Sequence, residues 1–201
     1  MKRAFDLVLG VLGLVLLSPL LVFLALLIRV MTGPPMLFRQ ARPGLQGKSF
    51  ILYKFRTMTV HSNCEGHSQT DEDRLTSLGR VLRRTSLDEL PELWNVIRGD
   101  MSLVGPRPLL VDYLDLYTPE QSRRHEVRPG MTGLAQVSGR NALDWEERFE
   151  RDVWYVDNWT MWLDLRILVQ TLITVLRMEG ISGGGRATME PYRGAGKVEN
   201  A

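Results

Sequence analysis

The sequence predicts a mainly α-helical protein with a small β-hairpin, an α+β fold, preceded by an N-terminal membrane helix. Three observations lead to this expectation. An apolar run without charges opens the chain, over residues 7–28. Apolar and polar residues alternate over residues 49–58, as in a strand. Apolar residues recur every three to four positions in several later segments, which indicates amphipathic helices, some suited to a membrane interface.

The composition is that of one globular domain with an appended element. The chain has 201 residues, 44% hydrophobic and 24% charged, so it is neither disordered nor a protein of many membrane spans. A net charge of +2 gives no indication of nucleic acid binding. One cysteine, Cys64, excludes an intramolecular disulfide. We expect a membrane helix at 1–32, a globular domain at 33–180 and a C-terminal tail, interpreted as a linker, at 181–201.

The apolar run Leu7–Ile28 differs from a simple membrane span in two ways. Ser18-Pro19 lies at its middle, where proline removes a backbone donor and kinks the helix, and the serine hydroxyl can bond back to a carbonyl. Both flanks are positive, so the positive-inside rule gives no orientation. Two alternatives remain: a re-entrant helix, broken at Ser18-Pro19, with both ends on the cytoplasmic side, and a kinked helix that spans the bilayer.

Two extended segments, Met36–Arg42 and Ser49–Met58, can pair as a β-hairpin across glycine-containing turns. Period-two alternation places Lys54 and Arg56 on one face of the second segment, beside each other. That spacing suits the binding of one phosphate group. The alternative is an edge strand with two solvated charges.

Two helices are expected next. Residues 74–84 form a short basic amphipathic helix, and residues 87–98 form a second, with its core stripe at Leu90, Leu93/Trp94 and Ile97. If Asp88 is the N-cap, Pro91 falls at the third helical position, where its missing donor costs no hydrogen bond. A capping box of Ser86 and Glu89 is the less favourable alternative.

The rest of the chain alternates between shaped loops and helices. Residues 101–108 are expected as a short strand leading into a proline-locked turn, Pro106-Arg107-Pro108. Residues 127–141 indicate a loop, and residues 142–158 a helix with Leu143, Phe149 and Val153 inward. Residues 162–177 form either an interfacial helix or a core helix.

The adjacent acids Asp88 and Glu89 are the candidate chemical groups. A helix start stabilises a carboxylate and can hold a phosphate. An ionised Asp88 can attack phosphorus or bind Mg²⁺, whereas Glu89 is open to roles as acid/base, metal aid or cap. Phosphoryl transfer needs charge neutralisation, and six basic residues are candidates for it: Lys54, Arg56, Arg83, Arg107, Arg128 and Arg140. The His61-x-x-Cys64-x-x-His67 pattern lacks a fourth ligand and is not interpreted as a metal site.

Taken together, these blocks resemble the bacterial sugar transferase family, and within it the small monotopic polyprenyl-phosphate phosphoglycosyl transferases. The resemblance covers essentially the whole chain. It rests on the apolar start with Ser18-Pro19, QARPGLQGKSFILYKFRTM (40–58), SLDELPELWNVIRGDMSLVGPRPLL (86–110) and RPGMTGLAQVSGRN (128–141). The short length and PLLVDYLDLY are most similar to the subgroup that acts on UDP-N,N′-diacetylbacillosamine in bacterial protein glycosylation.

The resemblance implies a ping-pong transfer. Asp88 would attack the β-phosphate of a UDP-sugar, release UMP and form a phosphosugar-enzyme, which undecaprenyl phosphate then resolves. The resemblance also implies Mg²⁺ bound at Asp88, with Glu89 as the second member of the dyad. Lys54, Arg83, Arg107 and Arg140 match the family's basic residues around the phosphates and the nucleotide.

The resemblance further favours the re-entrant helix and a location at the bacterial inner membrane. Residues 33–180 would then form a cytoplasmic catalytic domain, with the active site on the cytoplasmic face. The expected partners are a UDP-sugar, undecaprenyl phosphate, membrane lipid and downstream glycosyltransferases, and no nucleic acid. UDP-GlcNAc, UDP-GalNAc or another UDP-sugar is the alternative substrate. Two other functions remain open: a membrane module that binds anionic lipid without catalysis, and a nucleotide-sugar hydrolase in which water resolves the intermediate.

Overall fold

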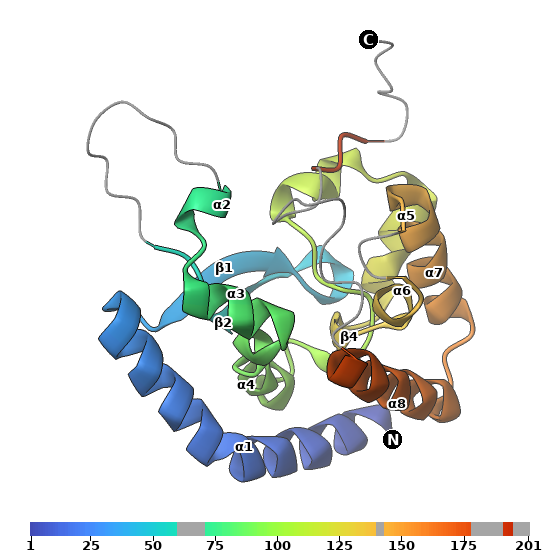
Figure 1. Cartoon of the computed structure of the whole chain (residues 1–201). Coiled ribbons are helices and arrows are strands. Elements are labelled where there is room, and N and C mark those ends of the chain that lie inside the picture. Colours follow the sequence, from blue (N-terminus) through green and yellow to red (C-terminus); the bar gives the residue numbers. More distant parts are fainter. Residues whose placement is uncertain (60–70, 140–142, 178–190, 195–201) are drawn as a thin grey trace.

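The computed structural model describes residues 1–59, 71–139, 143–177 and 191–194. Over these residues the protein is mostly helical, with an antiparallel hairpin and a second, parallel pair of short strands (Figure 1). The prediction of a mainly α fold with a small hairpin is therefore confirmed. The parallel pair was not predicted, because its strands have only three residues each.

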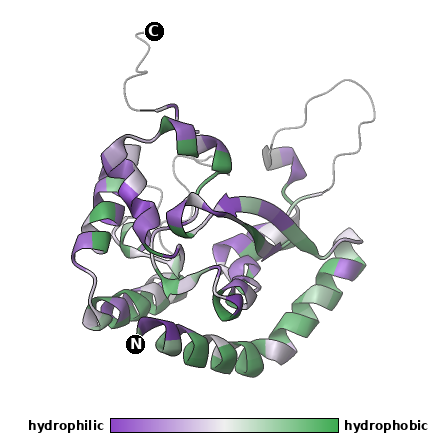
Figure 2. Cartoon of the chain, turned by 180° about the vertical axis from the view of Figure 1, so that it is seen from behind, coloured by the Kyte–Doolittle hydropathy of each residue, from purple (hydrophilic) through white to green (hydrophobic). Residues whose placement is uncertain are grey.

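The N-terminal helix α1 (Lys2–Thr32) is continuous and bends near its middle, where Pro19 lies (Figure 1). The Ser18 hydroxyl donates to the Val15 carbonyl at 2.8 Å, as expected for a serine that eases a proline kink. Among the described residues, α1 is the one helix long and apolar enough to cross a membrane. Its surface is largely hydrophobic (Figure 2), with large exposed side chains such as Val15, Leu16 and Phe23.

Both ends of α1 are fixed to the globular domain. At the start, Lys2 forms an ion pair with Asp164, and Arg3 donates to the Ile97 carbonyl at 2.7 Å. The buried Asp6 accepts from the Ser102 hydroxyl and the Leu103 amide at 2.9 and 3.1 Å. At the other end, Leu24 and Ile28 pack in an apolar cluster with Phe55 and Leu82. The helix therefore lies against one body at its two ends, while its middle is mostly exposed.

The hairpin consists of β1 (Leu37–Pro43) and β2 (Ser49–Phe55), paired antiparallel as predicted, with Leu37 opposite Phe55. A short 3₁₀ turn, Leu45–Gly47, joins them, and Gln46 and Gly47 there have positive φ angles of 54° and 72°. Leu52 and Phe55 are buried. Strand β2 ends at Phe55, so the predicted alternation stops before Arg56.

Helix α2 (Asp71–Arg74) precedes α3 (Ser77–Arg84), whose N-cap Thr76 accepts from the Gly79 amide at 2.9 Å. Next comes a 3₁₀ turn, Leu87–Glu89, before helix α4 (Glu92–Arg98). The preferred prediction for this stretch and its less favourable alternative were both wrong. Asp88 is not an N-cap, because Pro91 takes that position, and Ser86 has a left-handed conformation and caps nothing with its side chain.

The predicted core stripe of α4 was also partly wrong. Leu93 is buried, but Trp94 is 49% exposed. The buried face instead carries Glu92, Asn95 and Val96. The polar members of this face can be buried because Lys54 and the backbone of β2 bind them.

Strands β3 (Ser102–Val104) and β4 (Gly130–Thr132) pair in parallel under the proline-locked turn. A Cβ at Gly130 would lie 2.1 Å from the Gly105 nitrogen, so glycine allows the two backbones to meet. The connection between the strands contains 3₁₀ turns at Val111–Leu116 and Arg123–Glu126 around the short helix α5 (Pro119–Ser122). Helix α6 (Leu134–Val137) follows β4.

Helices α7 (Trp145–Asp157) and α8 (Met161–Arg177) close the domain. The inward prediction for Leu143, Phe149 and Val153 is confirmed, since all three are buried. Ile167 and Asp164 of α8 are fully buried, while the other side of this helix exposes large apolar side chains: Trp162, Leu165, Val169, Leu172 and Ile173.

The described part of the tail does not behave as a linker. Tyr192 is only 7% exposed and lies in an aromatic cluster with Tyr113, Tyr117, Trp145 and Phe149. Its backbone amide donates to the Tyr113 hydroxyl at 3.1 Å, and its own hydroxyl is 2.9 Å from the Gln121 side-chain oxygen.

Candidate active site

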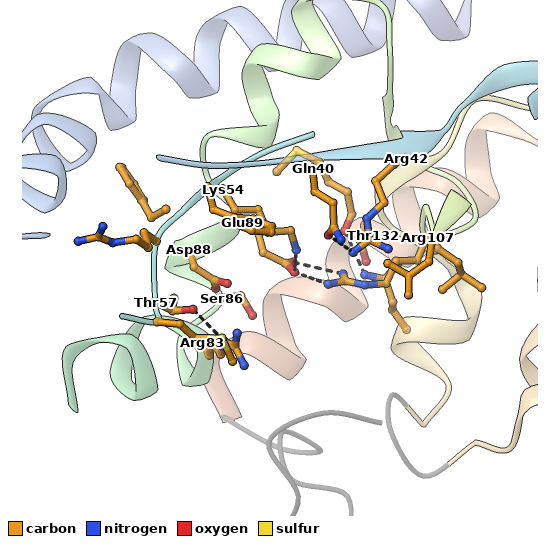
Figure 3. Close-up of a pocket in the computed structure, with 18 of the residues that line it drawn as sticks. Gln40, Arg42, Lys54, Thr57, Arg83, Ser86, Asp88, Glu89, Arg107 and Thr132 are labelled. Atoms are coloured by element: carbon orange, nitrogen blue, oxygen red, sulfur yellow. Dashed lines mark hydrogen bonds and ion pairs between the residues drawn. The ribbon is translucent and has the colours of Figure 1, made fainter. Parts of the chain in front are cut away.

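A cavity of about 1570 Å³ lies between the hairpin, the Asp88 turn, the proline-locked turn and the helices α6 to α8. Its wall contains six of the predicted site residues: Lys54, Arg56, Arg83, Asp88, Glu89 and Arg107. Figure 3 shows Asp88 and Arg83 on one side of the Lys54–Glu89 pair and Arg107 on the other. The structure therefore brings together residues that are separated by up to 53 positions in the sequence (from 54 to 107).

The charged groups in the centre form a compact network. Glu89 accepts from Lys54 Nζ at 2.7 Å and from both terminal nitrogens of Arg107, the longer contact being 3.4 Å. Lys54 Nζ also lies 3.0 Å from Glu92 Oε1. Glu89 thus joins the two cations, which places Lys54 and Arg107 at one point of the cavity wall.

Buried polar contacts fix the backbone segments that carry Lys54 and Arg107. The Asn95 side chain, with no exposed surface, accepts from the Tyr53 amide at 3.2 Å and donates to the Ile51 carbonyl at 2.7 Å. These bonds fix β2, and hence Lys54, against α4. Arg124 donates to the Arg107 carbonyl at 2.7 Å, which fixes the proline-locked turn.

Asp88 differs from its two acidic neighbours. It is 8% exposed, and among the described residues its carboxylate accepts no hydrogen bond. Burial raises its pKa above the ordinary value, the charge of Glu89 adds to this, and Lys54, Arg107 and Arg83 act in the opposite direction. Such a carboxylate is poorly solvated and unengaged, which favours reaction as a nucleophile.

Glu89 and Glu92 take opposite pKa shifts. Burial opposes ionisation of Glu89, but the charges of Arg107 and Lys54 and their hydrogen bonds outweigh it and lower the pKa. Burial dominates at Glu92 and raises its pKa to about 7, although Lys54 acts against this. Glu89 therefore stays ionised at neutral pH as the partner of two cations.

Several predicted phosphate-binding residues are held by other contacts or lie away from the cavity. Arg56 is 7% exposed, and its guanidinium donates to three successive carbonyls at the end of α1, those of Thr32, Gly33 at 2.6 Å and Pro34 at 2.9 Å. It caps the end of α1, although part of it lines the cavity. Arg128 donates to the Gly99 carbonyl at 3.0 Å and does not line the cavity. Arg140, His61, Cys64 and His67 lie outside the described residues.

The prolines of the turn have a backbone role in this structure. Pro106 and Pro108 are buried, and the Pro106 carbonyl accepts from the Gly130 amide at 3.0 Å. Sequence reasoning missed Arg42, Glu92 and Asn95. Arg42 lies within QARPGLQGK, part of one of the blocks that carry the family resemblance, but no local pattern indicates that its side chain lines the cavity.

The donor set for a divalent cation is small. No group of three or more His, Cys, Asp or Glu side chains suited to a metal occurs among the described residues. Among the described carboxylates that line the cavity, Asp88 is the one that is not already paired with a cation. One carboxylate together with substrate phosphates is a usual environment for Mg²⁺, so the site fits a metal that arrives with its substrate.

A comparison with protein families shows which family the chain belongs to. The sequence model described as bacterial sugar transferase matches residues 1–178. The chain belongs to the bacterial sugar transferase family. Membership confirms the family resemblance and the prediction of an enzyme.

Individual relatives of this chain also have the names of sugar transferases or sugar phosphotransferases. A Bacillus subtilis protein named uncharacterized sugar transferase EpsL is 53% identical over 200 residues, covering 100% of this chain and 99% of the relative. A Caulobacter vibrioides UDP-glucose:undecaprenyl-phosphate glucose-1-phosphate transferase is 44% identical over 187 residues, 87% of this chain and 69% of the relative. A Salmonella typhimurium undecaprenyl-phosphate galactose phosphotransferase is 42% identical over 197 residues, 90% of this chain but only 41% of the relative.

Proposed function

We propose that this protein is a phosphoglycosyl transferase that moves a sugar phosphate from a UDP-sugar to undecaprenyl phosphate. The observation that carries the proposal is the buried, unengaged Asp88 carboxylate beside the cations Lys54, Arg83 and Arg107 in one large cavity. A carboxylate nucleophile and a set of fixed cations are the groups that phosphoryl transfer requires. The names of the Caulobacter and Salmonella relatives support the choice of donor and acceptor.

The reaction would proceed in two displacements at one phosphorus atom. An Asp88 oxygen bonds to the β-phosphorus of the UDP-sugar while the bond from that phosphorus to the bridging oxygen breaks, and UMP leaves with the electron pair. A phosphate oxygen of undecaprenyl phosphate then bonds to the same phosphorus, and the Asp88 carboxylate is released. The products are UMP and a polyprenyl diphosphate sugar.

The cations have distinct places in this scheme. Lys54 and Arg107 are held by Glu89 on the cavity wall, so their positive charge is already placed before the substrate binds. Arg83 lies next to Asp88, with its Nε donating to the Thr57 hydroxyl at 3.0 Å. Mg²⁺ held by Asp88 and the substrate phosphates would neutralise further phosphate charge.

The attachment of both ends of α1 to one domain supports a re-entrant rather than spanning helix. A helix of this length would reach roughly 46 Å if straight, enough to cross a bilayer. A crossing would require the start of α1, held by Asp164 and Ser102, to lie on the opposite side from its end, held by Arg56. We therefore place the whole domain on the cytoplasmic face of the bacterial inner membrane.

The exposed apolar side of α8 and the exposed Trp154, Trp159 and Trp162 fit an interfacial position of this part of the domain. In this arrangement the nucleotide sugar would come from solvent and the lipid phosphate from the membrane. Downstream glycosyltransferases would then extend the lipid-linked sugar.

UDP-N,N′-diacetylbacillosamine is the donor that we propose to test first, because the short length of the chain and the block PLLVDYLDLY resemble that subgroup. The named relatives act on galactose and glucose donors, so a panel must include UDP-glucose, UDP-galactose, UDP-GlcNAc and UDP-GalNAc.

The decisive experiment measures UMP release by the full-length protein with each UDP-sugar, Mg²⁺ and undecaprenyl phosphate. Asp88→Asn is expected to lower turnover by at least about a thousandfold, because the amide is a poor nucleophile. Mass spectrometry of the unmutated protein, incubated with donor alone, should detect one phosphosugar adduct on Asp88.

The control is Asp115→Asn, because Asp115 is an exposed acid outside the cavity, and it should leave turnover unchanged. Three results would count against the proposal. These are an adduct on another residue, full UMP release without the lipid, which indicates a hydrolase, and no UMP release from any donor, which indicates a lipid-binding module.

A further inference from the structure

The cavity continues beyond the Glu89–Arg107 pair towards the aromatic cluster. Past Arg107 its wall includes Arg42, Tyr113, Trp145 and Arg148, together with Pro191 from the tail. Figure 1 places the described part of the tail, residues 191–194, on the side of the domain away from α1. This end of the cavity is therefore the one farther from the proposed membrane surface.

In-line displacement decides which half of a nucleotide sugar lies at this end. The attacking and leaving oxygens stand on opposite sides of the phosphorus. Asp88 is the proposed attacking group, so the leaving UMP must lie on the side away from Asp88. Figure 3 shows Arg107 and Arg42 on that side, beyond the Lys54–Glu89 pair.

Arg42 has the charge environment of an anion site. Among the residues that the structure describes, its guanidinium forms no ion pair. Its Nη2 donates to the Gln40 side-chain oxygen at 2.7 Å, its Nη1 makes a long contact of 3.4 Å with the Pro108 carbonyl, and its buried Nε has no partner. Burial and the charge of Arg107 lower its pKa. An anion between Arg42 and Arg107 would relieve this repulsion.

The aromatic side chains are suited to a nucleoside. Trp145 lies between Tyr113 and Phe149, with ring centroids 5.8 Å from each, and the Arg148 guanidinium lies 5.1 Å from its ring centroid. Tyr192 packs against Tyr113 and Trp145 at 5.8 and 5.5 Å, so it supports the two rings that line the cavity. The family model ends at residue 178, so Tyr192 is a contribution of this chain beyond that match.

We propose that the part of the cavity between Arg42 and the Tyr113–Trp145 wall binds the UMP half of the donor, and that Tyr192 of the tail positions this wall. Arg42 and Arg107 bind the α-phosphate and stabilise its charge as UMP leaves. Tyr113 and Trp145 contact the nucleoside. The inference rests on the proposed function in taking UMP as the leaving group.

The phosphate-binding and nucleoside-binding parts of this site predict different effects on the KM for the UDP-sugar donor and the KM for the lipid acceptor. The lipid phosphate also attacks opposite Asp88, so it uses Arg42 but has no nucleoside for the aromatic wall. Trp145→Leu and Tyr192→Ala are therefore expected to raise KM for the UDP-sugar about tenfold or more, without raising KM for undecaprenyl phosphate. Arg42→Gln is expected to raise both.

UMP alone is the binding probe. Titration calorimetry with the full-length protein should show that Arg42→Gln, Trp145→Leu and Tyr192→Ala each weaken UMP binding by about tenfold or more. Tyr192→Phe keeps the ring and should retain most of the affinity. Asp115→Asn, with its side chain outside the cavity, is the matched control. Thermal unfolding of each variant identifies loss of folding.

The outcomes separate this inference from the proposed function. UMP release by the unmutated protein, with unchanged UMP affinity and donor KM in folded Trp145→Leu and Arg42→Gln, would overturn the subsite and leave the transferase intact. Weakened UMP binding in those variants, without UMP release from any donor, would retain the subsite and overturn the transferase. If Tyr192→Ala does not fold, Arg42→Gln and Trp145→Leu still decide where UMP binds. The positioning role of the Tyr192 ring would be contradicted if Tyr192→Phe weakened UMP binding as strongly as Trp145→Leu does.

Discussion

Two ionic clusters, one buried and one half-buried on the cavity wall, lie close together in this protein and differ in how completely they are paired. In the first, Arg124 and Asp152 have side chains only 1% and 2% exposed, with Nη2 and Oδ2 2.6 Å apart. Arg124 also donates to the Arg107 carbonyl and the Tyr117 hydroxyl, at 2.7 and 3.3 Å. In the second, Glu89 joins Lys54 and Arg107, while Asp88 and Arg42 have no ion-pair partner among the described residues.

The difference separates a structural role from a chemical one. A fully paired buried cluster holds a turn in place, and here that turn carries Arg107 into the cavity. An incompletely paired cluster next to a cavity retains charge for a substrate. Burial of a charged group alone would not have distinguished the two, because Asp88 and Asp152 are both buried and burial raises the pKa of both.

The largest expected contrast is between two isosteric changes. Asp152→Asn leaves Arg124 as an unpaired buried cation and should lower the free energy of unfolding by about 3–5 kcal/mol. Asp88→Asn removes a poorly solvated charge, so the unfolding midpoint should stay the same or rise. Thermal unfolding in one detergent measures both. A fall of similar size in the two variants would show that Asp88 is a structural residue.

A smaller effect is expected at Glu92. Its pKa of about 7 in the folded state exceeds the ordinary value, so the folded state binds more protons and stability falls as pH rises towards 7. Glu92→Gln removes this loss. The variant should match the unmutated protein at about pH 4, below the ordinary pKa of a glutamate, and be more stable by about 1–3 kcal/mol at pH 8. Greater stability of the unmutated protein at pH 8 would mean that the Lys54–Glu92 pair is net stabilising.

The smallest expected effect is a shift in a pH profile. Asp88 must be ionised to attack, and its raised pKa places the acid limb of kcat/KM above the ordinary value of about 4. Arg83 favours the ionised form, so Arg83→Gln should move the acid limb to higher pH. Glu92→Gln should leave the acid limb of kcat/KM in place. If Glu92→Gln removed the limb, Glu92 rather than Asp88 would control it.

Local patterns in the sequence were sufficient for the hairpin and for much of the site. The alternation over 49–55 depends on residues close in the chain, and the strand that it predicts carries Lys54, which lines the cavity. The same pattern failed at Arg56, because β2 ends at Phe55 and the guanidinium turns to the carbonyls after α1. That contact joins residues 22 to 24 positions apart, which no period-two pattern describes.

Contacts across long sequence distances explain the other omissions. Asp6 bonds to Ser102, 96 positions away, and Tyr192 bonds to Tyr113, 79 positions away. The glycine-rich residues before Tyr192 predicted a linker, and nothing near it in sequence indicated an aromatic partner. Asp88 lines the cavity, but its predicted helix register was wrong because Pro91, and not Asp88, is the N-cap of α4.

The position of Asp88 on one wall of the cavity has a stereochemical consequence for the proposed reaction. The UMP that leaves and the lipid phosphate that arrives both use the side opposite Asp88, where Arg42 and Arg107 lie. Each in-line displacement inverts the configuration of the phosphorus. Two inversions restore it, so a donor made chiral at its β-phosphorus would yield a product of the original handedness. A single direct transfer would give the mirror arrangement.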